Sequence, residues 1–121
     1  MRPWVVVAAL NAAFAVALGA YAAHGLAGDE YAQSLGERAA LYQMAHALAI
    51  LAADRLAAEG RRAAHAAALL FTCAILAFCG SLTVKALGGP LPVPMITPTG
   101  GVMFILGWLA LAVGGLSRPR S

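Results

Sequence analysis

The sequence predicts an all-α fold, a four-transmembrane-helix bundle with both termini cytoplasmic. Three observations support this prediction: the composition, the length of the apolar stretches and the distribution of the basic residues. Hydrophobic residues make up 62% and charged residues 11% of the 121 residues, whereas a soluble domain contains about 25% charged residues. A soluble bundle of this size needs more polar surface. We therefore expect lipid to surround a single domain that covers residues 1–121.

The first two apolar stretches differ in polarity. About 20 apolar residues are needed to cross a bilayer as a helix, and residues 4–23 supply them with Asn11 as the one amide. The second stretch, residues 39–58, also contains Tyr42, Gln43, His46 and Asp54. Polar groups within a membrane helix usually face the interior of the bundle. We therefore expect the polar side of the second helix to face its neighbours.

The third and fourth helices are predicted at residues 63–87 and 98–116. The third is rich in Leu, Phe and Ala and ends near Lys85, whose long side chain can reach the headgroups. At the start of the fourth, Thr97 is expected to cap the first turn, and Pro98 to take the first helical position, where no amide donor is missed. The fourth helix therefore has a well-marked start.

Two connections are expected on the outer side of the membrane. In the first, residues 24–38, Asp29 can cap a short helix that turns Tyr31 and Leu35 toward lipid. The second, residues 88–94, contains two Gly and three Pro residues and cannot be helical.

The basic residues set the orientation. Six fall on one side of the predicted bundle: Arg2, Arg55, Arg61, Arg62, Arg118 and Arg120. Only Arg38 and Lys85 fall on the other. Because cytoplasmic loops carry the excess of Lys and Arg, both termini are predicted to be cytoplasmic.

Several function classes are not supported by the sequence. The net charge of +3 comes without a run of basic residues or an aromatic platform, so no nucleic-acid partner is expected. The chain is not expected to be an enzyme, because Asp54 lies eight residues from His46, about 12 Å along the helix, too far for a catalytic triad. The three histidines do not supply paired axial ligands for haem, and no cofactor is predicted.

The strongest candidate site is a group of polar residues in the outer half of the bundle. Tyr42, Gln43 and His46 lie at positions i, i+1 and i+4 of the second helix and should share one face. His24 ends the first helix and Thr97 opens the fourth. Polar residues in a membrane span often mark a functional site. Hydrogen bonding between helices is the alternative explanation.

The start of the fourth helix could add an anion site. A helix N-terminus presents free amide groups and a positive dipole end, here at Thr97, Gly100 and Gly101 near Lys85. An anionic lipid or a small carboxylated metabolite could bind there, with His24 or His46 as a second contact. Ordinary capping of the helix is the alternative.

Two further functions are considered beside a binding protein. A metal or redox protein could use His46 and Cys79, which lie at similar depth, although no paired ligand spacing such as CxxC occurs. A small transporter or channel component is the other. Small multidrug-resistance proteins have this size but carry a glutamate in the first helix, where this chain has only Asn11.

The glycines of the last helix suggest close helix contact. Gly100, Gly107 and Gly114 recur every seven residues and form a stripe of small residues along one side. Such stripes let membrane helices approach closely. The stripe predicts packing within the bundle or, as the alternative, the seam of a homo-oligomer.

Four ordered blocks resemble a known family. They are Leu18–Leu26 (LGAYAAHGL), Tyr42–Leu51 (YQMAHALAIL), Gly80–Leu82 (GSL) and Ile96–Gly101 (ITPTGG), the last followed by Phe104 and Gly107-Trp108. Together they are similar to the YgdD / transmembrane protein 256 family, the domain of unknown function 423. The resemblance implies a multi-pass, four-helix protein of the bacterial inner (plasma) membrane without an established activity. Cys79, where members often carry serine, and Thr83-Val84-Lys85 depart from the family pattern, which weakens a shared role for Cys79 or Lys85.

Overall fold

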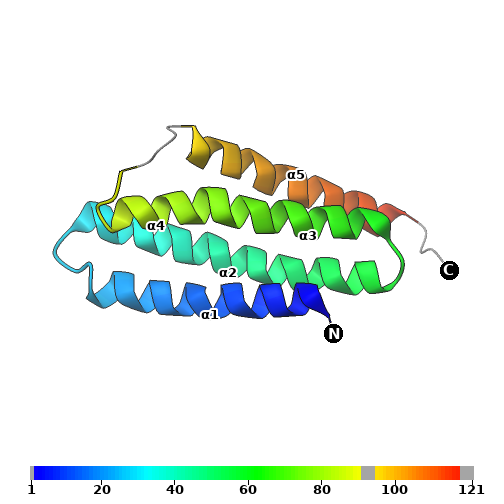
Figure 1. Cartoon of the computed structure of the whole chain (residues 1–121), viewed down its shortest axis with the longest axis horizontal. Helices are drawn as coiled ribbons and strands as arrows, with labels where there is room; N and C mark the ends of the chain where they lie inside the picture. Colours follow the sequence, from blue (N-terminus) through cyan, green and yellow to red (C-terminus); the bar gives the residue numbers. More distant parts are fainter. Residues whose placement is uncertain (1, 91–94, 118–121) are drawn as a thin grey trace.

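The computed structural model describes residues 2–90 and 95–117, which form antiparallel helices joined by turns (Figure 1). The elements are α1 (Pro3–His24), α2 (Glu30–Ala58), α3 (Arg62–Ala74), the π-helical turn η1 (Ile75–Cys79), α4 (Gly80–Ala86) and α5 (Ile96–Leu116). α3, η1 and α4 run on without a break as one helical rod. Within the described ranges there is no strand. The predicted all-α fold with four helices is therefore confirmed.

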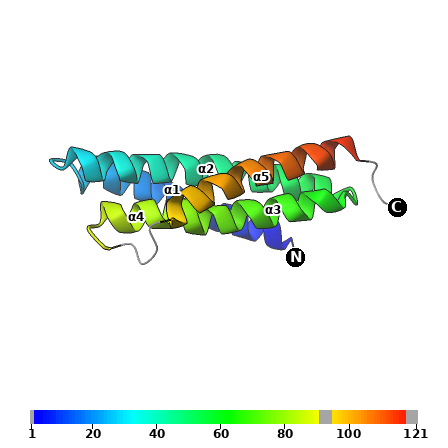
Figure 2. The ribbon, with the colours of Figure 1, turned by 90° about the horizontal axis from the view of Figure 1, so that it is seen from above.

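The helices lie in a fixed order across the bundle. α2 and the α3–η1–α4 rod form its middle, α1 lies against α2, and α5 lies against α3 and η1 (Figures 1 and 2). The core between them consists largely of alanine, and Phe71, Ile50 and Cys79 are its largest fully buried side chains. Small residues let the helix backbones come close together. α1 and α5 lie on different sides of the central pair, α1 against α2 and α5 against α3 and η1.

Three of the four helices are long and apolar enough to cross a membrane: Pro3–His24, Arg62–Ala86 and Ile96–Leu116. Their outward faces carry large apolar side chains, such as Leu10, Leu76 and Leu109. A face of this kind suits hydrocarbon better than water. α2 is not among the three, because its polar residues lower its hydropathy.

α2 begins nine residues before the predicted start at residue 39. Asp29 caps it as expected, since its side chain accepts a hydrogen bond of 3.1 Å from the Ala32 amide. The turn before it needs Gly28, whose φ is +101°. Tyr31 is 64% exposed, but Leu35 is buried with 5% exposure instead of facing lipid. The predicted short outer helix is thus the first part of α2, and its inner side packs against α1.

α5 begins at Ile96, two residues before the predicted start, with Met95 at its N-cap position. Thr97 and Pro98 therefore lie inside the first turn, and the predicted cap by Thr97 is not formed. The Thr97 hydroxyl instead forms a 2.5 Å hydrogen bond with the Ser81 hydroxyl on α4.

The predicted loop 88–94 is only partly described by the structure. Gly88 ends α4 with a φ of +83°. Residues 91–94 lie outside the described residues, as do Arg118 and Arg120.

Three side-chain contacts tie one end of the bundle together. Arg2 pairs with Asp54 at the end of α2, and the Trp4 indole donates to His65 Nδ1 on α3 at 3.1 Å. Arg61 donates to the Gly114 carbonyl at 3.1 Å and so satisfies carbonyls at the end of α5, where a positive charge is favoured. The start of α1, the α2–α3 turn and the end of α5 therefore share one end of the molecule.

Candidate ligand-binding site

His46 lies on the side of α2 that faces α5, and both of its ring nitrogens have protein partners. The Trp108 indole N–H, which can only donate, lies 3.0 Å from His46 Nε2. His46 Nε2 is therefore the acceptor, and the proton belongs on Nδ1, which donates to the Tyr42 carbonyl at 2.7 Å. The ring also stacks on Phe104 with centroids 3.7 Å apart. His46 thus joins α2 to α5.

A first pocket of about 540 Å³, here called the aromatic groove, surrounds this contact. It is lined by Tyr42, His46, Phe78, Pro98, Gly101, Val102, Phe104, Ile105 and Trp108. The Tyr42 ring packs on Phe78 with centroids 4.8 Å apart. Three of the predicted site residues, Tyr42, His46 and Gly101, therefore lie together here.

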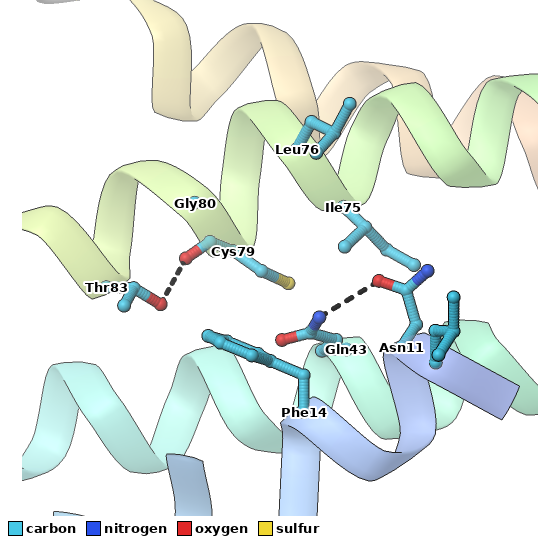
Figure 3. Close-up of a pocket in the computed structure, with 9 residues that line it drawn as sticks. Asn11, Phe14, Gln43, Ile75, Leu76, Cys79, Gly80 and Thr83 are labelled. Carbon is cyan, nitrogen blue, oxygen red and sulfur yellow. Dashed lines mark hydrogen bonds between the residues drawn. The ribbon is translucent and has the colours of Figure 1, made fainter. Parts of the chain in front are cut away.

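Gln43 faces a different pocket. Neighbouring residues on an α-helix point about 100° apart, so Gln43 turns toward α1 and η1 while Tyr42 turns toward α5. This second pocket, here called the Gln43 pocket, has a volume of about 380 Å³ (Figure 3). Its lining consists of Leu10, Asn11, Phe14, Gln43, Ile75, Leu76, Cys79, Gly80 and Thr83. The predicted shared face of Tyr42, Gln43 and His46 is thus divided between two pockets.

Two amide side chains form the polar part of the Gln43 pocket. Asn11 Nδ2 donates to the Val7 carbonyl at 2.8 Å, and Gln43 Nε2 donates to Asn11 Oδ1 at 2.9 Å. Gln43 is only 6% exposed. In Figure 3 its Oε1 points away from Asn11, toward Phe14 and Cys79. Asn11 is recognisable in the sequence as the one amide of the first helix, but its pairing with Gln43 is not, because the rotation of α1 against α2 carries no local signal.

The π-helical turn separates the two pockets. Ile75 and Cys79 of η1 line the Gln43 pocket, and Phe78 lines the aromatic groove. Such turns insert an extra residue into a helix and often occur at functional sites. α5 presses on η1 at Gly100, where an added Cβ would lie 2.5 Å from the Phe78 backbone nitrogen. η1 is therefore a shared wall whose position depends on α5.

The glycine stripe of α5 lies within the bundle. A Cβ at Gly107 would lie 2.7 Å from the Phe71 ring, and one at Gly114 would lie 3.4 Å from the Ala64 backbone nitrogen. Together with Gly100 these residues form the contact of α5 with α3 and η1. The surface predicted as the alternative oligomer seam is therefore already covered by the chain itself.

The remaining predicted residues do not converge. His24 is exposed at the end of α1, away from both pocket linings. Gly100 and Gly101 are the fifth and sixth residues of α5, so they lie beyond the four free amides of a helix start. The two glycines therefore do not supply the free amides expected for the anion site, whereas the Thr97 amide lies in the first turn.

The residues considered for a metal centre and for a catalytic triad lie apart in the structure. His46 and Cys79 line different pockets, and the part of the chain that the structure describes contains no group of three or more His, Cys, Asp or Glu residues suited to a metal ion. Asp54 pairs with Arg2 and not with His46. These contacts favour neither a metal centre nor a triad.

Comparisons with known proteins agree with the resemblance seen in the sequence. Residues 18–101 match the family model described as a protein of unknown function, DUF423. A UPF0382 membrane protein of Staphylococcus epidermidis is 40% identical over 96% of this chain and 97% of its own length. Similar proteins of Haemophilus influenzae and Bacillus subtilis are 37% and 35% identical, covering 92% and 96% of this chain and 91% and 98% of theirs. No solved structure gives a significant match.

Proposed function

Because the chain belongs to the DUF423 family of membrane proteins of unknown function, we propose a binding function for it. In this proposal it is a non-enzymatic, multi-pass protein of the bacterial inner membrane that holds a small membrane-soluble ligand in the Gln43 pocket. The Gln43 side chain provides the polar contact. Leu10, Phe14 and Ile75 provide apolar walls.

One observation carries the proposal: the Oε1 atom of Gln43 has no hydrogen-bond partner within residues 2–90 and 95–117, although Gln43 is 6% exposed. No fully enclosed polar side-chain atom in these ranges lacks a partner, so this oxygen opens into the pocket. An acceptor that is reachable from the pocket and has no protein donor needs one from a molecule that enters the pocket, and left unpaired in an apolar site it would cost about 1–3 kcal/mol. A ligand with a donor would remove that cost.

The position of the opening favours a ligand that comes from the bilayer. Leu10, Phe14 and Leu76 line the pocket and are 67%, 52% and 71% exposed. They belong to α1 and to the rod, both of which are apolar enough to cross a membrane. The pocket volume of about 380 Å³ lies within the usual range for small-molecule sites. The mouth therefore faces acyl chains.

In the proposed topology α2 also crosses the membrane. Trp4 and His65 bring the starts of α1 and α3 together, and α1 runs away from that end before α2 begins. α2 must therefore return the chain over the same distance, and its 29 residues span about 44 Å, more than the roughly 30 Å of hydrocarbon. Arg2, Arg55, Arg61 and Arg62 at the shared end favour a cytoplasmic location for it.

Transport and metal binding are not proposed. The buried acidic residue Asp54 is paired with Arg2 at the end of the bundle, and the first helix contributes an amide that is bonded to Gln43. Both ring nitrogens of His46 have partners. No contact among the described residues favours either function over binding.

The proposal can be tested by the apolar molecules that copurify with the protein. Gln43→Leu should lose a stoichiometric apolar compound that mass spectrometry finds with the wild type. Tyr42→Phe is the matched control, because it changes the neighbouring residue in the aromatic groove and keeps the ring that packs on Phe78. Circular dichroism verifies that both variants keep their helices. Equal copurified compounds in wild type and Gln43→Leu, or no bound compound in either, would count against binding in this pocket.

A further inference from the structure

We infer that the ligand of the Gln43 pocket is an uncharged long-chain alcohol whose hydroxyl donates a hydrogen bond to Gln43 Oε1. This inference rests on the proposed function and names the class of ligand. It follows from the direction of the two amides, the other polar atoms of the pocket and the depth of the site.

The direction of the amides is set step by step from the backbone. The Val7 carbonyl can only accept, so the group of Asn11 that lies 2.8 Å from it must be the amide nitrogen. Asn11 Oδ1 is then the atom that faces Gln43, and it requires a donor. Gln43 must supply that donor from Nε2 at 2.9 Å, which leaves Oε1 toward the pocket. The hydrogen-bond network thus decides which end of each amide faces the pocket.

The other polar atoms of the pocket also favour a donor on the ligand. The Thr83 hydroxyl donates its proton to the Cys79 carbonyl at 2.7 Å, so only its lone pairs remain for a ligand. The Cys79 thiol is a weak donor. Two oxygens, Gln43 Oε1 and Thr83 Oγ1, therefore offer lone pairs, while the second N–H of each amide remains as a donor. A hydroxyl, which both donates and accepts, can use both kinds of group, whereas an ether or an ester leaves the oxygens without a donor.

Charge selects against ionised ligands. None of the nine lining residues is Lys, Arg, Asp, Glu or His. A carboxylate would bring negative oxygens against two acceptors, and an ammonium group would lack a counter-charge. Burying an unpaired charge costs far more than one hydrogen bond returns. A neutral hydroxyl group fits the pocket without this penalty.

The depth of the site selects against phospholipid headgroups. Asn11 lies eight residues after the start of α1 and 13 before its end, about 12 Å and 20 Å along the helix. A phospholipid headgroup is held at the interface and does not reach this depth. A long-chain alcohol can move to this depth as a whole molecule. Its single hydroxyl loses water on the way, and the hydrogen bond to Gln43 replaces most of that hydration.

The test compares tetradecanol with its methyl ether and with tetradecanoic acid. Wild-type protein is placed in phosphatidylcholine nanodiscs, which contribute no competing hydroxyl, and binding of each labelled compound is measured above that of empty nanodiscs. Tetradecanol should bind about tenfold more tightly than the ether, the difference expected for one satisfied buried acceptor. The acid should also bind more weakly than the alcohol.

Variants connect this preference to the two amides. Gln43→Leu should bring the alcohol-to-ether ratio close to one. Asn11→Leu should lower the alcohol-to-ether ratio as well, because the Gln43 amide can then turn its nitrogen toward the ligand. This variant tests the inference independently if Gln43→Leu does not fold. Tyr42→Phe lies in the aromatic groove and should leave the ratio unchanged.

The possible outcomes separate the inference from the proposed function. Equal binding of alcohol and ether would overturn the inference while leaving an apolar binding pocket. If the acid bound most tightly, the inference would also be overturned, and an anionic ligand would be favoured instead. Failure of all three compounds to bind would remove the proposed function together with the inference.

Discussion

The two faces of α2 handle buried polarity in opposite ways. Toward α5, His46 has a partner for each ring nitrogen and is held between aromatic rings. Toward α1, Gln43 is bonded through its nitrogen alone, and its oxygen opens into a pocket. A histidine on an otherwise apolar helix is the usual first candidate for a functional residue, yet here both of its ring nitrogens have partners. The comparison shows that completeness of hydrogen bonding is more informative than residue type.

The contact that holds η1 between the two pockets should give the largest effect. An added methyl group at Gly100 would lie 2.5 Å from the Phe78 backbone nitrogen, and a backbone atom cannot rotate away. We expect Gly100→Ala to lower the free energy of unfolding by about 1–3 kcal/mol. Unfolding in mixed detergent micelles would measure it.

Gly101→Ala is the control for this change. Its Cβ would lie 3.8 Å from the Phe78 ring, which is ordinary contact, and it should be neutral or slightly stabilising. Equal stability of the two variants would mean that α5 does not press on η1, and the two pockets would then have no rigid common wall.

The variant His46→Phe tests the face of α2 that packs against α5, where both ring nitrogens of His46 have partners. The phenyl ring can keep the stacking on Phe104 but leaves the Trp108 indole N–H without its acceptor. We expect a loss of about 1–3 kcal/mol in unfolding free energy. The double variant His46→Phe with Trp108→Phe should cost less than the sum of the two single variants, because removing both partners leaves no unpaired group.

If His46→Phe proved neutral and its tryptophan fluorescence unchanged, the contact between α2 and α5 would not depend on this hydrogen bond. His46 would then be free to act on a ligand in the aromatic groove, and the contrast between the two faces would disappear.

Much of the fold could be predicted from the sequence because apolar length is a local property. Residues 4–23 and 98–116 differ from α1 and α5 by only one or two residues at their ends. The sequence predicts a short helix after Asp29 but not its continuity with α2, because Glu30, Glu37 and Arg38 indicate a connection outside the membrane. In the structure, the cap by Asp29 and the contacts with α1 make this segment helical, and those contacts depend on a distant part of the chain.

The site was only partly predictable for a related reason. Tyr42, Gln43 and His46 could be recognised as a polar group, but α2 has neighbours on several sides, and adjacent residues therefore enter different pockets. The pairing of Asn11 with Gln43 depends on the depth and rotation of two helices. His24 was included from its position at a helix end, and that position alone does not bring it to a pocket.

The smallest effect on stability is expected on the face of α2 that packs against α1. It is measured as the coupling free energy between Asn11 and Gln43. Hydrogen bonds between membrane helices contribute on average about 0.6 kcal/mol in double-mutant cycles. Asn11→Leu, Gln43→Leu and the double variant should give a coupling of this size. A coupling well above that of His46 and Trp108 would reverse the comparison, since Gln43 would then mainly hold the bundle together. A small coupling with loss of the alcohol preference would instead separate binding from stability, because Gln43 would contribute more to the ligand than to the fold.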